Sequence, residues 1–228
     1  MGPPHPTRAY ARATLSRKRR GIARDHHSYI PFPGLFRMIP LIVNGPAIEP
    51  IALADAKKWL KIETSDDDDV VGALITAARL MVEAQIRRML ITQTWRLIHD
   101  RWPNGRLIKI PLAPFQSLIA MRVYDANGTA QAVSSSLYYV DSVPDAARII
   151  FGAPPPTPGR ANAGIEIDIV VGYGASAESV PEPLRQAIRM LVTDWYENRG
   201  DAGADDLANA LPSSARALAA PYQRPKLA

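Results

Sequence analysis

Cysteine is absent from this chain of 228 residues. Its absence excludes disulfide scaffolds, thiolate zinc sites and cysteine nucleophiles, and it suits a protein that folds in a reducing compartment such as the cytoplasm. No run of about 18 apolar residues occurs and the N-terminus lacks the apolar block of a secretory signal, so we expect no membrane-spanning segment. The hydrophobic content of 47% and the charged content of 21% are typical of a globular protein with a substantial core.

Histidine is scarce, and its positions argue against catalysis. Three of the four histidines lie within the first 38 residues, and the fourth, His99, stands alone in a predicted strand. Catalytic triads and HExxH metal sites need such a base or ligand, and no nucleophile elbow, Walker loop or dinucleotide fingerprint occurs either. Four carboxylates are each predicted on a solvated helix or strand face: Glu83, Glu166, Asp168 and Asp194. We therefore expect no enzymatic activity, no catalytic residue, no metal site and no cofactor.

Positive charge is concentrated at one end of the chain. Residues 1–38 hold eight arginine and lysine residues against one aspartate, a net charge of +7, which leaves −2 for the remaining 190 residues. This segment is rich in proline and shows no helical or strand period, so we expect a disordered basic leader, or an untranslated one if the natural start is Met38. An alternative function rests on it, because a basic arm binds nucleic acid through counterion release. On that hypothesis the chain is a nucleic-acid-binding accessory protein.

Apolar side chains recur every three or four residues in three segments, which predicts helices over residues 53–62, 66–90 and 183–199. The first helix is weakly specified, because Ala52 stands where a capping serine or threonine is expected. The third has clear ends, with Pro183 in its first turn and a glycine directly after its last residue.

Four consecutive aspartates, residues 66–69, stand before the long apolar repeat of the second helix. Consecutive helical residues point about 100° apart, so these carboxylates do not converge on one ion, and the spacing of a calcium-binding loop is missing. We interpret Ser65 as the N-cap and the aspartates as the first turn, where the helix dipole favours negative charge by about 0.3–1 kcal/mol per group. The competing hypothesis is a small hydrolase that uses these carboxylates.

Over residues 92–174 the apolar period changes to two, which predicts strands and hairpins, one of them turning at Asn127 and Gly128. The predicted fold class is α+β. It is a helical bundle of about three main helices, with a small and mostly antiparallel β-sheet inserted between the second and the last long helix and with flexible N- and C-terminal arms. We expect this domain to cover residues 39–200 and a separate tail, rich in alanine and proline, to cover residues 201–228.

The order of these elements resembles the head-tail connector, or adaptor, family of tailed bacteriophages and gene transfer agents. The resemblance runs from about Pro46 to Arg199 and rests on an ordered set of segments rather than on one motif. One departure is Ala52, where the family tends to carry serine or threonine. The segments that carry it are "PAIEPIALADAKKWLKIE", "DDDDVVGALITAARLMVEAQIRRMLITQTWRL", "VYDANG", "LYYVD" and "VVGYGASAESVPEPLRQAIRMLVTDWYENR".

The resemblance implies a structural role. Family members commonly form a twelve-subunit ring beneath the portal protein, in the neck of the virion or gene transfer agent particle, after assembly in the host cytoplasm. The implied partners are other copies of the chain, the portal protein, the next neck or tail component (a stopper or tail terminator) and double-stranded DNA that passes through the channel without sequence specificity, with no membrane involved.

The C-terminal segment resembles the extended tails by which such adaptors hold the portal. Tyrosine and arginine are favoured at interfaces, and a tail that becomes ordered over its partner couples folding to binding. We therefore expect the portal-binding residues to be Leu211, Arg216, Leu218, Pro221, Tyr222, Arg224 and Pro225.

Overall fold

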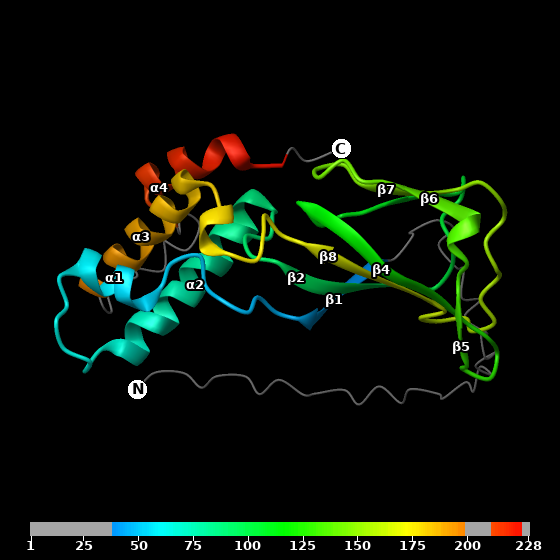
Figure 1. Ribbon diagram of the computed structural model, residues 1–228, viewed down its shortest axis with the longest axis horizontal. Coiled ribbons are helices and arrows are strands. Elements are labelled where there is room, and N and C mark those ends of the chain that lie inside the picture. The colour runs from blue at the N-terminus through cyan, green and yellow to red at the C-terminus, as the bar shows by residue number, and fades with distance from the viewer. Residues whose placement is uncertain (1–37, 199–210, 225–228) are drawn as a thin grey trace, which may run out of the picture. The chain divides into compact units, whose positions relative to one another are not determined.

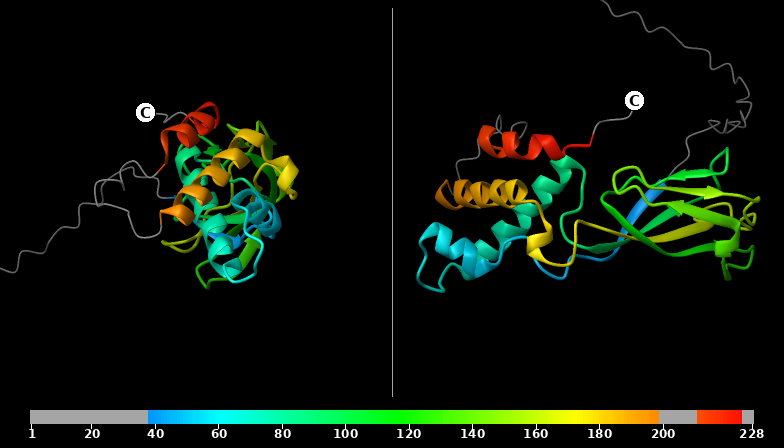
Figure 2. Two further views of the ribbon diagram at one scale, coloured as in Figure 1. Left: turned by 90° about the vertical axis from the view of Figure 1, so that its left-hand side faces the viewer. Right: turned by 45° about the horizontal axis from the view of Figure 1, so that its top comes forward.

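The computed structural model describes residues 38–198 and 211–224, all of which belong to one compact unit that spans Phe36–Ala228 (Figure 1). Helices gather at one end of this unit and strands at the other, as the right-hand view of Figure 2 also shows. Within the described residues, no helix combines the length and the apolar character needed to cross a membrane.

Among the described residues, four α-helices form the helical end: α1 (Leu53–Leu60), α2 (Asp68–Ile86), α3 (Glu182–Glu197) and α4 (Ser213–Ala219). Helix α3 packs against each of the other three helices, and α2 contacts α1 and α4. Short 3₁₀ turns precede α3 and follow α4, at Ala177–Ser179 and Ala220–Tyr222. The α4 helix comes from the part of the chain that the sequence interpretation treated as a separate tail.

In the part of the chain that the structure describes, eight strands form two antiparallel sheets, which agrees with the predicted α+β class. The five-stranded sheet has the order β1-β2-β8-β4-β5 and the three-stranded sheet has the order β3-β7-β6. In chain order the strands are β1 (Met38–Asn44), β2 (Gln93–His99), β3 (Leu107–Lys109), β4 (Phe115–Tyr124), β5 (Ala130–Ala132), β6 (Tyr138–Asp141), β7 (Arg148–Phe151) and β8 (Ile165–Val171).

The β structure extends beyond the predicted insertion. Strand β1 lies before the first helix, yet it pairs with β2 along nearly its whole length, with Leu41 opposite Arg96 and Pro40 opposite Leu97. A strand whose partner is more than 50 residues away gives no local signal of its pairing, so the sequence interpretation left β1 out of the sheet.

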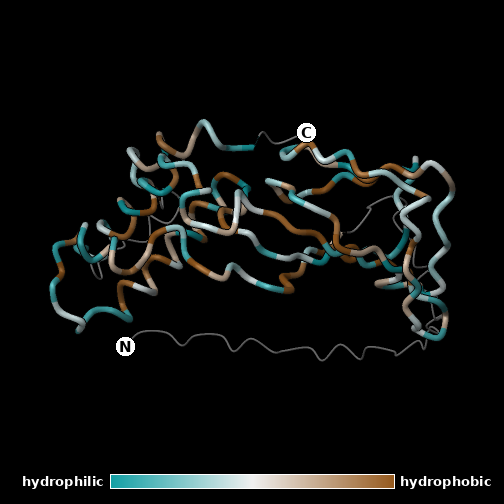
Figure 3. The backbone as a smooth tube through the Cα atoms, in the orientation of Figure 1, coloured by the Kyte–Doolittle hydropathy of each residue, from teal (hydrophilic) through white to brown (hydrophobic). Residues whose placement is uncertain are grey.

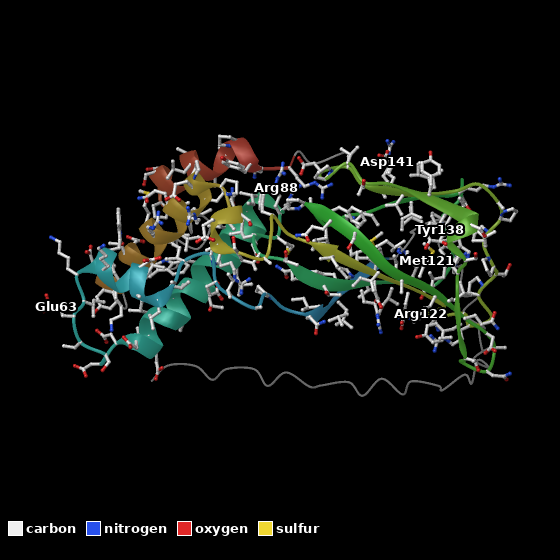
Figure 4. The ribbon with its side chains drawn as sticks, in the orientation of Figure 1. Glu63, Arg88, Met121, Arg122, Tyr138 and Asp141 are labelled. Carbon is white, nitrogen blue, oxygen red and sulfur yellow. The ribbon has the colours of Figure 1, made fainter. Side chains whose placement is uncertain are left out.

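The helices enclose one apolar core and the two sheets enclose another. Fully buried side chains in the helical core include Val71, Ile75, Val82, Leu184, Ile188 and Leu191. The sheet core draws on both sheets: Met121 of β4 and Tyr138 of β6, both labelled in Figure 4, contribute to it together with Leu97, Ile149 and Ile167. Burying each such aliphatic side chain contributes about 1.5–3 kcal/mol to folding, so each end of the unit has its own source of stability.

The start of α2 differs from the prediction. Ser65 is not the N-cap: the helix begins at Asp68, with Asp67 in the capping position and no side-chain hydrogen bond to the free N–H groups. Only Asp68 and Asp69 therefore occupy the first turn, where the helix dipole favours their negative charge.

The end of α2 also differs from the prediction, which placed it at residue 90. The helix stops at Ile86 because Arg87 adopts a left-handed conformation (φ 57°). The backbone N–H of Leu90, four residues beyond the helix, donates to the carboxylate Oε1 of Glu83 at 2.8 Å. Residues 87–90 therefore turn back toward the helix and do not extend it.

Glu83 is the centre of a buried polar network at this junction. The residue is 4% exposed, which corrects its predicted place on a solvated face. Its Oε1 accepts from Leu90 N and from Gln93 Nε2 (3.3 Å), and its Oε2 accepts from Arg79 Nη1 at 2.9 Å. Arg79 also donates to Glu49 at 2.8 Å. Burial raises the pKa of Glu83, although the Leu90 N–H and Arg79 oppose that effect.

Replacing Glu83 with alanine removes the acceptor for Leu90, Gln93 and Arg79 together. We expect the free energy of unfolding, measured by urea denaturation near neutral pH, to fall by about 3–5 kcal/mol, as when one partner of a buried ion pair is removed. The control Glu63→Ala alters an exposed glutamate and should change that energy by less than about 0.5 kcal/mol. Equal and small effects of the two substitutions would contradict the role given to Glu83.

Candidate functional site

The C-terminal segment, residues 211–224, lies on the helical end of the unit. Three of its residues, Leu211, Ala215 and Ala219, are at most 4% exposed and belong to the helical core. The spacing of Ala215 and Ala219 places both on the face of α4 that packs against α3. This segment is ordered against its own chain, through contacts that the apolar pattern of residues 201–228 only faintly indicated.

Five of the seven predicted portal-binding residues differ in how deeply they are buried. Leu211 is buried, and Leu218 and Tyr222 are half-buried against the helical core. Arg216 and Pro221 are exposed, and the Arg216 guanidinium donates to the carbonyl of Leu211 at 3.2 Å.

The last two predicted residues are placed differently. Arg224 is half-buried at the junction of helices and strands. Pro225 lies outside the described residues, as do the arginines of the basic leader up to Arg37.

The end of the C-terminal segment caps helix α2. The backbone N–H of Arg224 donates to the carbonyl of Ile86 at 3.0 Å, and the Gln223 side chain donates to the carbonyl of Gln85 at 3.1 Å. The last carbonyls of a helix have no partner within the helix, so these two bonds satisfy groups that would otherwise need water. The arginine also brings positive charge to the end of α2, where the helix dipole favours it.

The same residues connect the helices to the strand end. The Arg224 guanidinium donates to the carbonyls of Pro111 (2.5 Å) and Asp145 (2.8 Å). Arg88 donates to the carbonyl of Tyr222 at 2.6 Å and forms an ion pair with the Asp145 carboxylate. Figure 4 shows Arg88 where the C-terminal segment approaches the strands.

A second charged cluster, which the sequence interpretation missed, lies on the five-stranded sheet. Asp168 is 5% exposed and accepts from Arg96 at 2.7 and 3.0 Å and from Arg122 at 2.6 Å. Burial raises the pKa of Asp168, but hydrogen bonds from Arg96 and Arg122 outweigh burial, so the pKa lies below its ordinary 3.8. Alternation along β8 indicated that Asp168 faces away from the sheet core, but not that arginines on two neighbouring strands would cover it.

The aspartates at the start of α2 contact other helices. Asp67 accepts from the Tyr196 hydroxyl of α3 at 2.5 Å, and Asp68 accepts from Lys57 of α1 at 2.5 Å. Across residues 38–198 and 211–224, no group of three His, Cys, Asp or Glu side chains is placed to hold a metal ion. The carboxylates therefore link α2 to its neighbours and do not form the reactive cluster that a hydrolase needs.

Neither His99 nor the groove beside α2 presents a reactive group. His99 is buried in the sheet end, and burial lowers its pKa to about 4, so the imidazole is neutral near pH 7. A groove of about 430 Å³ lies between residues 48–55, α2 and the start of α3. Its two arginines, Arg185 and Arg189, both form ion pairs with Glu182, so they do not present a ready site for an anionic substrate.

Comparison with known proteins gives a consistent result. Residues 50–151 match the family model of phage gp6-like head-tail connector proteins. No curated protein matches the chain. Solved structures do match, and two of them are a chain in the neck of an empty GTA particle computed with C6 symmetry (25% identity, TM-score 0.71) and a chain in the virion of a native gene transfer agent particle (26% identity, TM-score 0.68).

A third match is a chain in the neck of a native GTA particle computed with C12 symmetry, with 26% identity and a TM-score of 0.66. The alignments cover 82–83% of this chain and 97% of each neck or virion chain. The resemblance found in the sequence is thereby confirmed, and the family that matches is one of structural connector proteins and not of enzymes.

The Asp168 cluster makes stability depend on pH. We expect Asp168→Asn to lower the free energy of unfolding by about 2–3 kcal/mol near pH 7, because charged hydrogen bonds from two arginines are lost. The folded pKa is below the unfolded one, so this stabilisation is present above about pH 4 and is lost as the pH falls through the folded pKa. The difference between wild type and variant should therefore shrink in acid, as measured by urea denaturation at a series of pH values.

The matched control is Asp141→Asn, which affects the more exposed pair that Asp141 forms with Arg148 across β6 and β7. We expect a change of less than about 1 kcal/mol at neutral pH. If Asp168→Asn lowers the free energy of unfolding by the same amount at neutral and at acidic pH, Asp168 is not the charged, arginine-bound carboxylate assigned here.

Proposed function

We propose that this chain, which resembles the head-tail connector family, is the structural adaptor in the neck of a phage or gene transfer agent particle. On this proposal, copies of the chain assemble into a ring beneath the portal protein, extend the DNA channel and join the head to the tail. The observation that carries the proposal is the alignment of 97% of each matched neck or virion chain with this one at TM-scores of 0.66–0.71. The C6 and C12 symmetries of two matched necks are both compatible with a twelve-subunit ring.

The charge distribution supports passage of DNA without sequence recognition. Residues 39–228 carry a net charge of −2, which has the same sign as the phosphate backbone. A slightly acidic body does not gain affinity from counterion release, so DNA moves past it without being held. Residues 39–228 thus surround double-stranded DNA without binding it tightly, and the alternative of nucleic-acid binding rests on residues 1–38.

The C-terminal segment supports a contact with the portal protein. Its inner face is occupied by contacts within the chain, and its outer face presents the exposed Arg216 and Pro221 beside the half-exposed Leu218 and Tyr222. An arginine and a tyrosine beside apolar groups are typical of the residues that dominate interface energies. The opposite end of the ring then contacts the next neck component, a stopper or tail terminator.

Point substitutions test this contact better than a deletion. Removing residues from about 205 onward takes Leu211, Ala215 and Ala219 out of the helical core, so the deletion affects folding as well as binding. The double variant Arg216→Glu with Pro221→Ala changes two exposed side chains of the segment. We expect it to stay folded by circular dichroism, to lose about tenfold or more in co-purification with the portal protein of the same particle, and to leave filled heads without tails.

The matched control is Lys58→Glu, a charge reversal at an exposed position of α1 that should leave portal binding unchanged. If the double variant binds the portal as wild type does and the particles carry tails, the C-terminal segment is not the portal contact. If the wild-type chain itself is absent from the necks of purified particles, the adaptor function is wrong.

A further inference from the structure

Helix α2 places its charges on the inside. After its first turn the helix contains only two charged residues, Arg79 and Glu83, and they are 6% and 4% exposed. They form an ion pair with each other within the protein. A helix on the surface of a globular protein normally carries its charged residues on the side that faces water.

The side of α2 that faces solvent is instead apolar. Five exposed residues follow one another at spacings of three and four, so they form a stripe about 21 Å long on one face. We call this stripe the outer face of α2; Val70 and Leu80 in it are 41% and 52% exposed. Its members are Val70, Ala73, Ala77, Leu80 and Ala84.

A helix that is apolar on opposite sides is typical of one covered by protein on both. The inner side of α2 is covered by α1, α3 and α4. The outer face holds no cation that could contact phosphate and no side-chain hydrogen-bond donor, so neither nucleic acid nor a polar ligand matches its chemistry. An uncharged apolar surface of another protein does match it.

Strand β1 and the loop after it supply a second surface of the same chemistry. Of the eleven large hydrophobic side chains that are exposed among the described residues, five lie here: Ile39, Leu41, Ile42, Val43 and Ile48. The strand sequence, MIPLIVN, contains no charge, and β1 pairs on one side only, with β2. Pro40 has no N–H to offer an added strand, so a partner contacts β1 through side chains rather than by extending the sheet. Figure 3 shows both β1 and stretches of α2 in the brown of hydrophobic residues.

A closed ring requires two different surfaces on every subunit, each contacting the neighbour on one side. This chain carries two uncharged apolar surfaces, on α2 and on β1, so another copy of it offers a partner of matching chemistry. The outer face of α2 exposes on the order of 300 Å², less than the roughly 800 Å² that each partner contributes to a stable interface. Such a contact is too small to hold two free subunits together and suits a ring that closes only during assembly.

We propose that the outer face of α2 is a contact surface between copies of this chain in the assembled neck. This rests on the ring assembly proposed above and adds the surface by which neighbouring copies meet. It assigns to Val70, Ala73, Ala77, Leu80 and Ala84 a role that no contact among residues 38–198 and 211–224 explains.

Photo-crosslinking in particles identifies what covers this face. The chain has no cysteine, so Leu80→Cys in the full chain provides a single attachment point for benzophenone maleimide. After assembly and irradiation, we expect crosslinked pairs in which both peptides come from this chain, identified by mass spectrometry. Crosslinks to the portal or to another neck protein, or no crosslink in necks that contain the labelled chain, would overturn the proposal.

A charge on the same face tests the contact without a label. Ala77→Glu places a carboxylate in the middle of the stripe at an exposed position, so we expect an unchanged circular dichroism spectrum, a thermal midpoint within a few degrees of wild type and at least about a tenfold loss of neck-incorporated chain. The matched control, Ala54→Glu, changes an exposed alanine of α1 beside Asp55 and should be incorporated normally.

Normal incorporation of Ala77→Glu would contradict the contact. If control and wild-type chains are found in necks while Ala77→Glu is not, the ring assembly and this surface are both supported. If even the wild-type chain is missing from necks, the ring assembly fails, and this surface fails with it.

Discussion

The buried carboxylate of Glu83 is the constraint on which the two-part architecture depends. It is taken out of water near the end of α2, and donors from the chain itself, Arg79, Leu90 and Gln93, compensate that cost. Meeting this requirement turns the chain at Arg87 and brings it directly into β2. The helical core and the sheet core are therefore joined at a fixed point, and the C-terminal segment completes the junction by capping the end of α2.

Charge is used for internal connections throughout the described residues. Asp67 and Asp68 join α2 to α3 and α1, Asp168 holds arginines of two strands, and Arg224 connects the helices to the loops of the strand end. Charged groups engaged in this way provide rigidity and not reactivity. On our proposals, the surfaces offered to partners are the apolar outer face of α2, the apolar strand β1 and the outer side of the C-terminal segment, which suits a connector that works by fitting between other proteins.

The sequence was informative where the signal is local. Apolar spacing located α1, α2 and α3 to within about four residues but missed α4, alternation indicated the β structure, and the order of segments led to the connector family. It failed where the partner is distant in the chain. The solvated position given to Asp168 and the omission of β1 from the sheet were wrong for this reason, since arginines of β2 and β4, and strand pairing across α1 and α2, decide them. The solvated position given to Glu83 and the cap at Ser65 were wrong for a different reason: the partners of Glu83 are near in the chain, but apolar spacing does not show where a helix begins or where the chain turns back. The residues expected to bind the portal stay a prediction, and most of them also serve the fold of their own subunit.

The most direct test is a cryo-electron microscopy reconstruction of the neck from particles that contain this chain. We expect a ring of identical subunits directly beneath the portal, into which the described residues fit as one body, with the outer face of α2 covered by the adjacent subunit. A neck in which this chain is absent, or in which it forms no ring beneath the portal, would contradict the proposed function.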